Sequence, residues 1–181
     1  VYKRQVILTG VYADESVTSD GISIEDVGGS KGITIKNVTA EKNYAHNIYA
    51  SNIAGNAALS TVTANNSTDY MGIFLNVING TKGVTMKDIV ASDNYDRNIM
   101  LDNIAGNVGL SGITAERCVS SSGILIVRAG GIKGVTMKGI KANANDLENI
   151  ALNYITGNVT LSAIEANDGM GVGSTLSLIH I

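Results

Sequence analysis

The sequence predicts an all-β fold: a right-handed parallel β-helix solenoid of about six to seven coils, each of ~25 residues, built as a two-coil repeat of 51 residues. The first observation is that KGVTMKDIVASDNYDRNIMLDNIAGN at residues 82–107 recurs with substitutions at 31–56 and 133–158, an offset of 51 residues each time. The second is that isoleucines recur at alternating steps of 26 and 25 residues, which divides each unit into two coils: Ile22, Ile48, Ile73, Ile99, Ile124 and Ile150. A fixed period indicates one structural unit stacked on copies of itself.

Each coil begins with a short strand that is apolar on one face. The recurring isoleucine follows Gly or Asn, and a second small or aliphatic residue stands two positions later, as Leu75 follows Ile73. This period of two predicts a half-buried strand. Further along every coil a glycine occupies one fixed place: Gly29, Gly55, Gly80, Gly106, Gly131 and Gly157. We expect a position where a Cβ would clash, as at a corner with positive φ.

Two more strands complete each predicted coil. In one coil they read Ile33-x-Ile35 and Val38-x-Ala40. Alanine ends the third strand seven times, which predicts a tight interior column: Ala13, Ala40, Ala64, Ala91, Ala115, Ala142 and Ala166. The usual hand of crossovers between parallel strands makes the solenoid right-handed. An α-solenoid is disfavoured because no apolar period of 3.6 residues persists for the length of a helix.

Both ends of the chain depart from the repeat. Residues 1–5 read VYKRQ and the last residues read LSLIHI, which resemble translated adaptor sequence at the ends of assembled environmental reads. We therefore expect non-native ends at 1–5 and 174–181 around a parallel β-helix at 6–173, in a piece of a longer parent chain. The alternative is that both segments are genuine end caps.

Composition narrows the classes of partner. The net charge is −3, which argues against a nucleic-acid partner, because phosphate binding needs a basic patch. No apolar run is long enough to span a bilayer. The one cysteine, Cys118, excludes an internal disulfide.

The coil pattern resembles a known family. Gly-Ile-x-Leu, then a Gly-Asn or Gly-Thr corner, then two short strands ending in Asn-rich turns is similar to the parallel β-helix repeat of the pectate-lyase-like superfamily, over residues 6–173. The resemblance implies a secreted or cell-surface protein among polysaccharide lyases, hydrolases, epimerases, phage tailspikes and adhesins. Specific enzyme motifs are absent: the chain has no proline, so the Asp-Pro-His run of mannuronan epimerases cannot occur.

The turn after the third strand carries one polar column. It holds Asn43, Ser67, Asn94, Cys118 and Asn145. Asn side chains stacked along the axis can hydrogen-bond to one another, so we interpret this column as structural and Cys118 as an inert small residue.

The next turn holds the only polar cluster with catalytic potential. Its candidates are Asp69, Asp96, Arg97, His46 and Tyr70. Two carboxylates on adjacent coils could perform acid–base chemistry on a sugar or bind a hard cation such as Ca²⁺. His46 and Arg97 lie two coils apart, ~9.6 Å by stacking, which is too far for direct contact. Such turn residues are usually a solvated rim, so we expect no dedicated metal site and no cofactor.

An apolar stripe occupies the outward positions of the first strand. Tyr49, Phe74, Met100 and Leu125 follow one another on successive coils, with Asn76, Asp102 and Asn47 as polar neighbours. Stacking would place the first two rings ~4.8 Å apart as a flat platform for a sugar face. The stripe predicts either a carbohydrate site or a face covered by missing parts of the parent chain.

Two functions therefore remain open. The first is a non-enzymatic segment of a large secreted or cell-surface protein, a stalk or adhesin module that contacts a polysaccharide or cell-surface glycan. The alternative is a fragment of a polysaccharide lyase or glycoside hydrolase that uses Asp69, Asp96 and Arg97.

Overall fold

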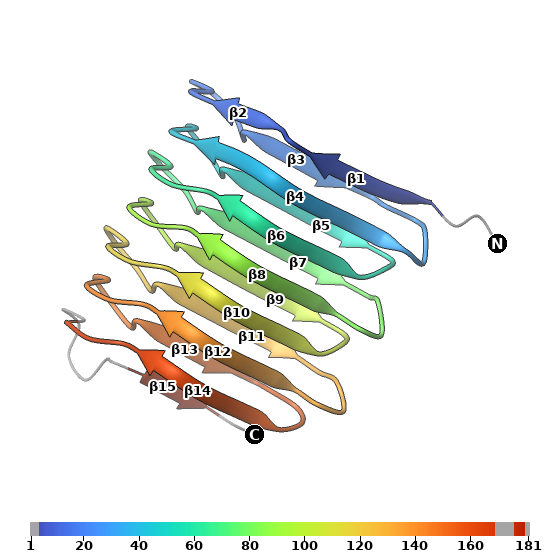
Figure 1. The fold of residues 1–181 in the computed structure, drawn as a ribbon, viewed down its shortest axis with the longest axis vertical. Coiled ribbons are helices and arrows are strands. Elements are labelled where there is room, and N and C mark those ends of the chain that lie inside the picture. Colours follow the sequence, from blue (N-terminus) through green and yellow to red (C-terminus); the bar gives the residue numbers. More distant parts are fainter. Residues whose placement is uncertain (1–3, 169–175, 180–181) are drawn as a thin grey trace.

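The computed structural model describes residues 4–168 and 176–179. In this range the chain is a right-handed parallel β-helix of about six turns, and the described residues contain no helix (Figure 1). The predicted fold class is confirmed.

Two parallel sheets form the walls of the solenoid, and beyond the first coil the chain alternates between them. Sheet A contains β1 (Gln5–Thr9), β2 (Tyr12–Asp14), β4 (Gly32–Glu41), β6 (Ala57–Thr63), β8 (Val84–Val90), β10 (Val108–Thr114), β12 (Val135–Lys141) and β14 (Val159–Glu165). Sheet B contains β3 (Ile22–Glu25), β5 (Ile48–Ile53), β7 (Ile73–Ile78), β9 (Ile99–Ile104), β11 (Ile124–Ala129), β13 (Ile150–Asn153) and β15 (Leu176–Ile179).

The core lies between the sheets and consists of aliphatic columns. Ile48 pairs with Ile73, which pairs with Ile99, and all three side chains are fully buried. The isoleucine column therefore points inward, as predicted. The core side chains are less buried toward both ends of the solenoid: Leu8 and Leu161 are only partly buried, whereas Leu110 is 2% exposed. A terminal coil has a neighbour on one side only, so its inner face loses contacts.

Beyond the first coil, the second and third predicted strands are one element, not two. β4 runs from Gly32 to Glu41 through both predicted strands, and the bend between them is Asn37 with a φ of 52°. Its equivalents in the following coils also have positive φ: Thr61, Asp88, Gly112, Gly139 and Ala163. One left-handed residue turns the strand enough for the apolar residues on both sides to face the core, while the parallel pairing resumes directly after it.

A Cβ would clash at the fixed glycine column, as predicted, but positive φ is not the general reason. Among its members only Gly157 has positive φ, at 92°. The others are needed for close backbone approach: a Cβ on Gly106 would lie 2.5 Å from the carbonyl oxygen of Gly80. The left-handed corner of sheet B is instead taken by non-glycine residues: Asp26, Asn52, Val77, Asn103, Arg128 and Tyr154.

The alanine column is the tight interior that the sequence predicts. Ala91 and its neighbours Ala64 and Ala115 have no exposed surface. We expect Ala91→Leu to lower the free energy of unfolding by ~1–3 kcal/mol, because the larger side chain must force its packed neighbours apart. The neighbouring Val90 is 40% exposed, so Val90→Leu should change the free energy of unfolding by less than ~0.5 kcal/mol. Urea titration of both variants measures the two changes. Equal stability of both variants would show that the column is not tightly packed.

The asparagine column forms a chain of amides through the interior. Asn43 Nδ2 donates to Asn47 Oδ1 at 2.8 Å, and Asn47 Nδ2 donates to Asn94 Oδ1 at 3.0 Å. The same two steps continue through Asn98 and Asn145 to Asn149, and all six side chains are fully buried. The predicted hydrogen bonding along the axis is confirmed, but it runs through Asn47, Asn98 and Asn149, which the predicted column did not include.

The chain of amides explains why the sequence repeat is two coils long. The column position carries asparagine in every second coil. In the coils between, the backbone N–H of Ser67 or Cys118 donates to Asn94 Oδ1 or Asn145 Oδ1, both at 2.9 Å. One asparagine pair therefore serves two coils, and the sequence repeats after 51 residues.

The two ends of the chain join the sheets where the structure describes them. Gln5 pairs with Gly32, and Leu176–Ile179 pair with Ile150–Asn153. Residues 1–3, 169–175 and 180–181 lie outside the described residues. The expected non-native ends at 1–5 and 174–181 stay a prediction.

Candidate functional site

Four rings gather on the outer face of sheet B. His46 stacks on Tyr49 with centroids 5.3 Å apart and an interplanar angle of 23°, and its ring also lies 5.3 Å from Tyr70 and 5.6 Å from Phe74. Tyr49 and Phe74 are 5.5 Å apart. We call His46, Tyr49, Tyr70 and Phe74 the aromatic face.

Strand register and hydrogen bonds to Asp20 hold these rings in place. Tyr49 on β5 pairs with Phe74 on β7, so both side chains point outward side by side. His46 lies in the turn before β5. Its backbone N–H and its Nδ1 both contact Asp20 Oδ1 at 2.9 Å. An ionised carboxylate only accepts hydrogen bonds, so Nδ1 carries the proton and the ring is oriented over Tyr49.

The aromatic face is not the flat platform that stacking predicted. The Tyr49 and Phe74 rings are tilted by 41° and stand further apart than the strands, because the histidine ring packs against both of them. Met100 and Leu125 continue the outward row in register with Phe74, and both are half-buried. The row is therefore an apolar strip whose rings form a shallow, angled end.

The polar neighbours differ in their availability. Asn47 has no exposed surface and belongs to the amide chain, so the expectation that it reaches a ligand is wrong. Asp102 is bound through Oδ2 to Arg128 at 2.6 Å. Within the described residues, Asp102 Oδ1 and Asn76 Oδ1 are buried acceptors with no donor, and Asn153 Oδ1 in the same outward column is a third. Buried acceptors without donors are uncommon, so this column needs hydroxyl, amide or water partners.

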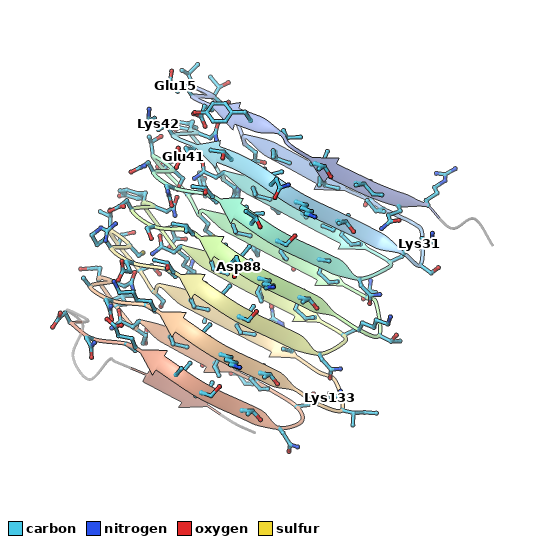
Figure 2. The ribbon with its side chains drawn as sticks, viewed as in Figure 1. Glu15, Lys31, Glu41, Lys42, Asp88 and Lys133 are labelled. Atoms are coloured by element: carbon cyan, nitrogen blue, oxygen red, sulfur yellow. The ribbon has the colours of Figure 1, made fainter. Side chains whose placement is uncertain are left out.

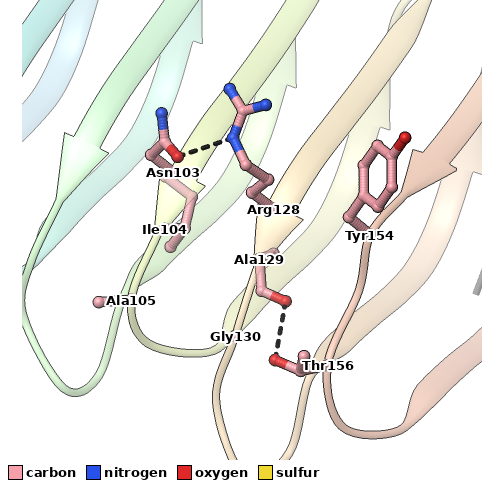
Figure 3. A pocket seen from close by; sticks show the side chains of 8 residues that line it. All are labelled: Asn103, Ile104, Ala105, Arg128, Ala129, Gly130, Tyr154 and Thr156. Carbon is pink, nitrogen blue, oxygen red and sulfur yellow. Dashed lines mark hydrogen bonds between the residues drawn. The ribbon is translucent and has the colours of Figure 1, made fainter. Parts of the chain in front are cut away.

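A pocket that the sequence did not reveal lies beside this column. Its volume is about 450 Å³, and Figure 3 shows Arg128 and Tyr154 standing over it from neighbouring coils. Arg128 Nε donates to Asn103 Oδ1 at 2.8 Å. Asn103, Arg128 and Tyr154 all occupy the left-handed corner of sheet B, with φ between 52° and 54°. Asn and Asp elsewhere in that column were an available signal, since both tolerate this conformation, whereas Arg128 and Tyr154 carry no such signal.

The predicted catalytic residues come together only in part. Arg97 NH1 contacts Asp96 Oδ2 at 2.7 Å, and the backbone N–H of Asp96 donates to the Tyr70 oxygen at 3.0 Å. The Tyr70 ring in turn lies against His46 in the aromatic face. Among the described residues, no ion pair or hydrogen bond joins Asp69 to Asp96, and no group of three His, Cys, Asp or Glu side chains is placed to hold a metal ion.

Cys118 behaves as a buried structural residue. Burial raises the pKa of its thiol, and Sγ donates to the backbone oxygen of Asp96. A raised pKa lowers the thiolate fraction that makes a cysteine reactive. Both observations agree with the structural interpretation of this column.

Across residues 4–168 and 176–179, no helix is long and apolar enough to cross a membrane. No protein family, no curated protein and no solved structure matches this chain. The evidence for function therefore comes from the surfaces of the structure itself, first of all the outer face of sheet B.

Proposed function

We propose that this chain is a non-enzymatic β-helix module that contacts carbohydrate through the aromatic face. The observation that carries the proposal is the cluster of four rings, 5.3–5.6 Å apart, on an outward surface of sheet B. Sugar rings present apolar C–H faces that aromatic side chains can cover.

Polar groups beside the rings support the same kind of ligand. The buried acceptors of Asn76 and Asp102 lie in the column next to the apolar row, and neither has a donor within the described residues. Sugar hydroxyls are hydrogen-bond donors, so a small movement of these side chains upon binding would satisfy both acceptors.

The architecture supports a role as a surface module. The solenoid is a rigid rod in which every coil buries the next, and its length grows by ~4.8 Å per coil. With the resemblance to the pectate-lyase-like superfamily, we infer a stalk or adhesin segment of a longer secreted or cell-surface protein. The parent chain would supply the remaining domains.

The alternative is a fragment of a polysaccharide lyase or glycoside hydrolase acting through Asp69, Asp96 and Arg97. One observation favours it: Arg97 Nε is buried beside the Asp96 carboxylate and has no partner among the residues that the structure describes. It has less support than the binding module, because acid–base cleavage of a glycosidic bond needs two carboxylates that converge on the sugar.

A glycan array tests the proposal with a double variant. We expect Tyr49→Ala with Phe74→Ala to keep the fold, because both side chains point away from the core, and to lose the glycans that the wild type binds. The matched control is Tyr12→Ala with Tyr95→Ala, which removes two exposed aromatic rings outside the aromatic face.

Two results would contradict the binding module. One is a wild type that binds no glycan, and the other is equal loss of binding in both double variants. Release of new chain ends from a polysaccharide, abolished by Asp96→Asn, would establish the enzyme alternative instead.

A further inference from the structure

A second surface, on sheet A, carries a regular arrangement of lysines. Lys36, Lys87 and Lys138 occupy one outward column, in which they alternate with Ser60, Ser111 and Ser162. All three lysines are exposed. They stand two coils apart, ~9.6 Å along the axis.

A parallel row of lysines lies at the turns that enter the same strands. Lys31, Lys82 and Lys133 each occupy the third position of a tight turn, which is closed by a hydrogen bond from the next glycine N–H to the glycine oxygen three residues earlier, at 2.8–3.0 Å. Figure 2 shows Lys31 and Lys133 at these turns, at one edge of sheet A. All three are exposed. We call the two rows together the lysine face.

The charges of the lysine face are not neutralised by the protein. Within the described residues, Lys31, Lys36, Lys82, Lys133 and Lys138 make no ion pair, and Lys87 has only an exposed contact of 3.9 Å with Asp88. Five other cations are paired with carboxylates at 2.6–3.4 Å: Lys42, Arg97, Arg117, Arg128 and Lys141. The chain has a net charge of −3, so the lysine face is an unpaired basic surface on a protein that is acidic overall.

A smooth, neutral floor separates the two rows. From β4 to β14 the column between them consists of small residues: Thr34, Ala58, Thr85, Gly109, Thr136 and Thr160. The floor is as wide as the strand segment between the turn and Lys36, ~13 Å. The floor therefore continues along the solenoid axis with charged side chains on both sides and no bulky group across it.

We propose that the lysine face binds a linear acidic polysaccharide that lies along the solenoid axis. The lysines recur at a constant interval, which matches a polymer whose charges also recur, and the threonine hydroxyls of the floor can exchange hydrogen bonds with sugar hydroxyls. Lysine binds sulfate or carboxylate as a point charge, without the fixed geometry of an arginine fork. The aromatic face lies on the other sheet, so the two surfaces are separate.

Other anionic partners fit this face less well. Single-stranded nucleic acid is bound by basic grooves with aromatic side chains on which bases stack, and no aromatic residue lies in either lysine row or in the floor. Lipid surfaces are bound by basic faces that also insert apolar side chains. The exposed aliphatic side chains near this face lie on different coils: Ile7 on β1, Val90 on β8 and Ile132 beside Lys133. Ile7 and Ile132 are five coils apart, ~24 Å, so these residues do not form a continuous apolar anchor.

The test compares polysaccharides that differ in charge alone. Titration of the wild type with dextran sulfate should give saturable binding that weakens as salt is added, whereas neutral dextran should not bind. A polyuronate arm shows whether carboxylate serves as well as sulfate. The triple variant Lys36→Gln, Lys87→Gln, Lys138→Gln should bind dextran sulfate roughly tenfold more weakly, because each exposed ion pair contributes a small share of the free energy.

A matched triple variant controls for net charge. Lys42→Gln, Arg117→Gln, Lys141→Gln removes three exposed cations that lie outside the lysine face, and it should bind like the wild type. Equal weakening in both triple variants, or tighter binding to single-stranded DNA or to anionic vesicles than to either acidic polysaccharide, would overturn the proposal. The Tyr49→Ala, Phe74→Ala variant should retain dextran sulfate binding, which separates this proposal from the aromatic face.

Discussion

Replacing Asn94 with alanine is expected to lower the free energy of unfolding by at least about 3 kcal/mol, because each buried polar group that loses its partner costs ~1–3 kcal/mol. The Asn94 amide makes four side-chain hydrogen bonds of 2.9–3.0 Å inside the solenoid, and it has no exposed surface. Its partners are the Ser67 N–H, Asn47 Nδ2, the Ala64 oxygen and Asn98 Oδ1. Urea unfolding followed by circular dichroism measures the change.

Asn79→Ala is the matched control for this prediction. Asn79 is exposed, and its backbone N–H bonds to the Ile53 oxygen in a way that alanine can reproduce. The control should therefore unfold within ~0.5 kcal/mol of the wild type. If Asn94→Ala were as stable as Asn79→Ala, the amide chain would contribute nothing to the fold.

Gly83→Ala is expected to destabilise the protein by about 2–5 kcal/mol, the sum of a left-handed backbone penalty and a steric clash. Gly83 has a φ of 70°, and a Cβ there would lie 2.7 Å from the backbone nitrogen of Asn107 on the next coil. Neither the turn nor the neighbouring strand can move without breaking the hydrogen bonds that close them.

Gly109→Ala should have the opposite effect. Gly109 lies in β10 without positive φ, and a Cβ at this position meets nothing within 4 Å. Alanine restricts the unfolded chain and should stabilise the protein by ~0.4–1 kcal/mol. Loss of stability in Gly109→Ala, or none in Gly83→Ala, would contradict this account of the turns.

The sequence was sufficient for the fold because the inward columns repeat in register. The equivalents of Ile73, Leu75 and Ala91 recur at fixed steps along the chain. The alternation of apolar and polar residues within each strand then indicates which side of the strand is buried. The bend at Asn37 was not predictable in the same way, since its equivalents include Thr61 and Ala163, and no residue type marks the left-handed position. What is common to that column is a backbone angle rather than a side chain.

The candidate site was predicted less completely because its contacts cross between columns. Tyr49 and Phe74 belong to one column and were found together. His46 was assigned to the catalytic turn, although it stands three residues before Tyr49 and packs on the Tyr49 ring. Likewise, the four-residue spacing between Asn94 and Asn98 recurs in each 51-residue unit and was the available signal for the amide chain. Comparison of equivalent positions alone does not detect such sideways contacts.

The amide chain also governs how a solenoid of this kind can lengthen in evolution. The amide-to-amide hydrogen bonds between units all run in one direction along the axis, so the Nδ2 of one unit meets the Oδ1 of the next, as from Asn98 to Asn145. Unequal recombination in steps of 51 residues joins matching ends and leaves every amide paired. A crossover displaced by one coil joins mismatched ends and leaves a buried amide donor without an acceptor. Duplication is therefore quantised in pairs of coils, and each added pair extends the rod by ~9.6 Å together with one more lysine in each row of the lysine face.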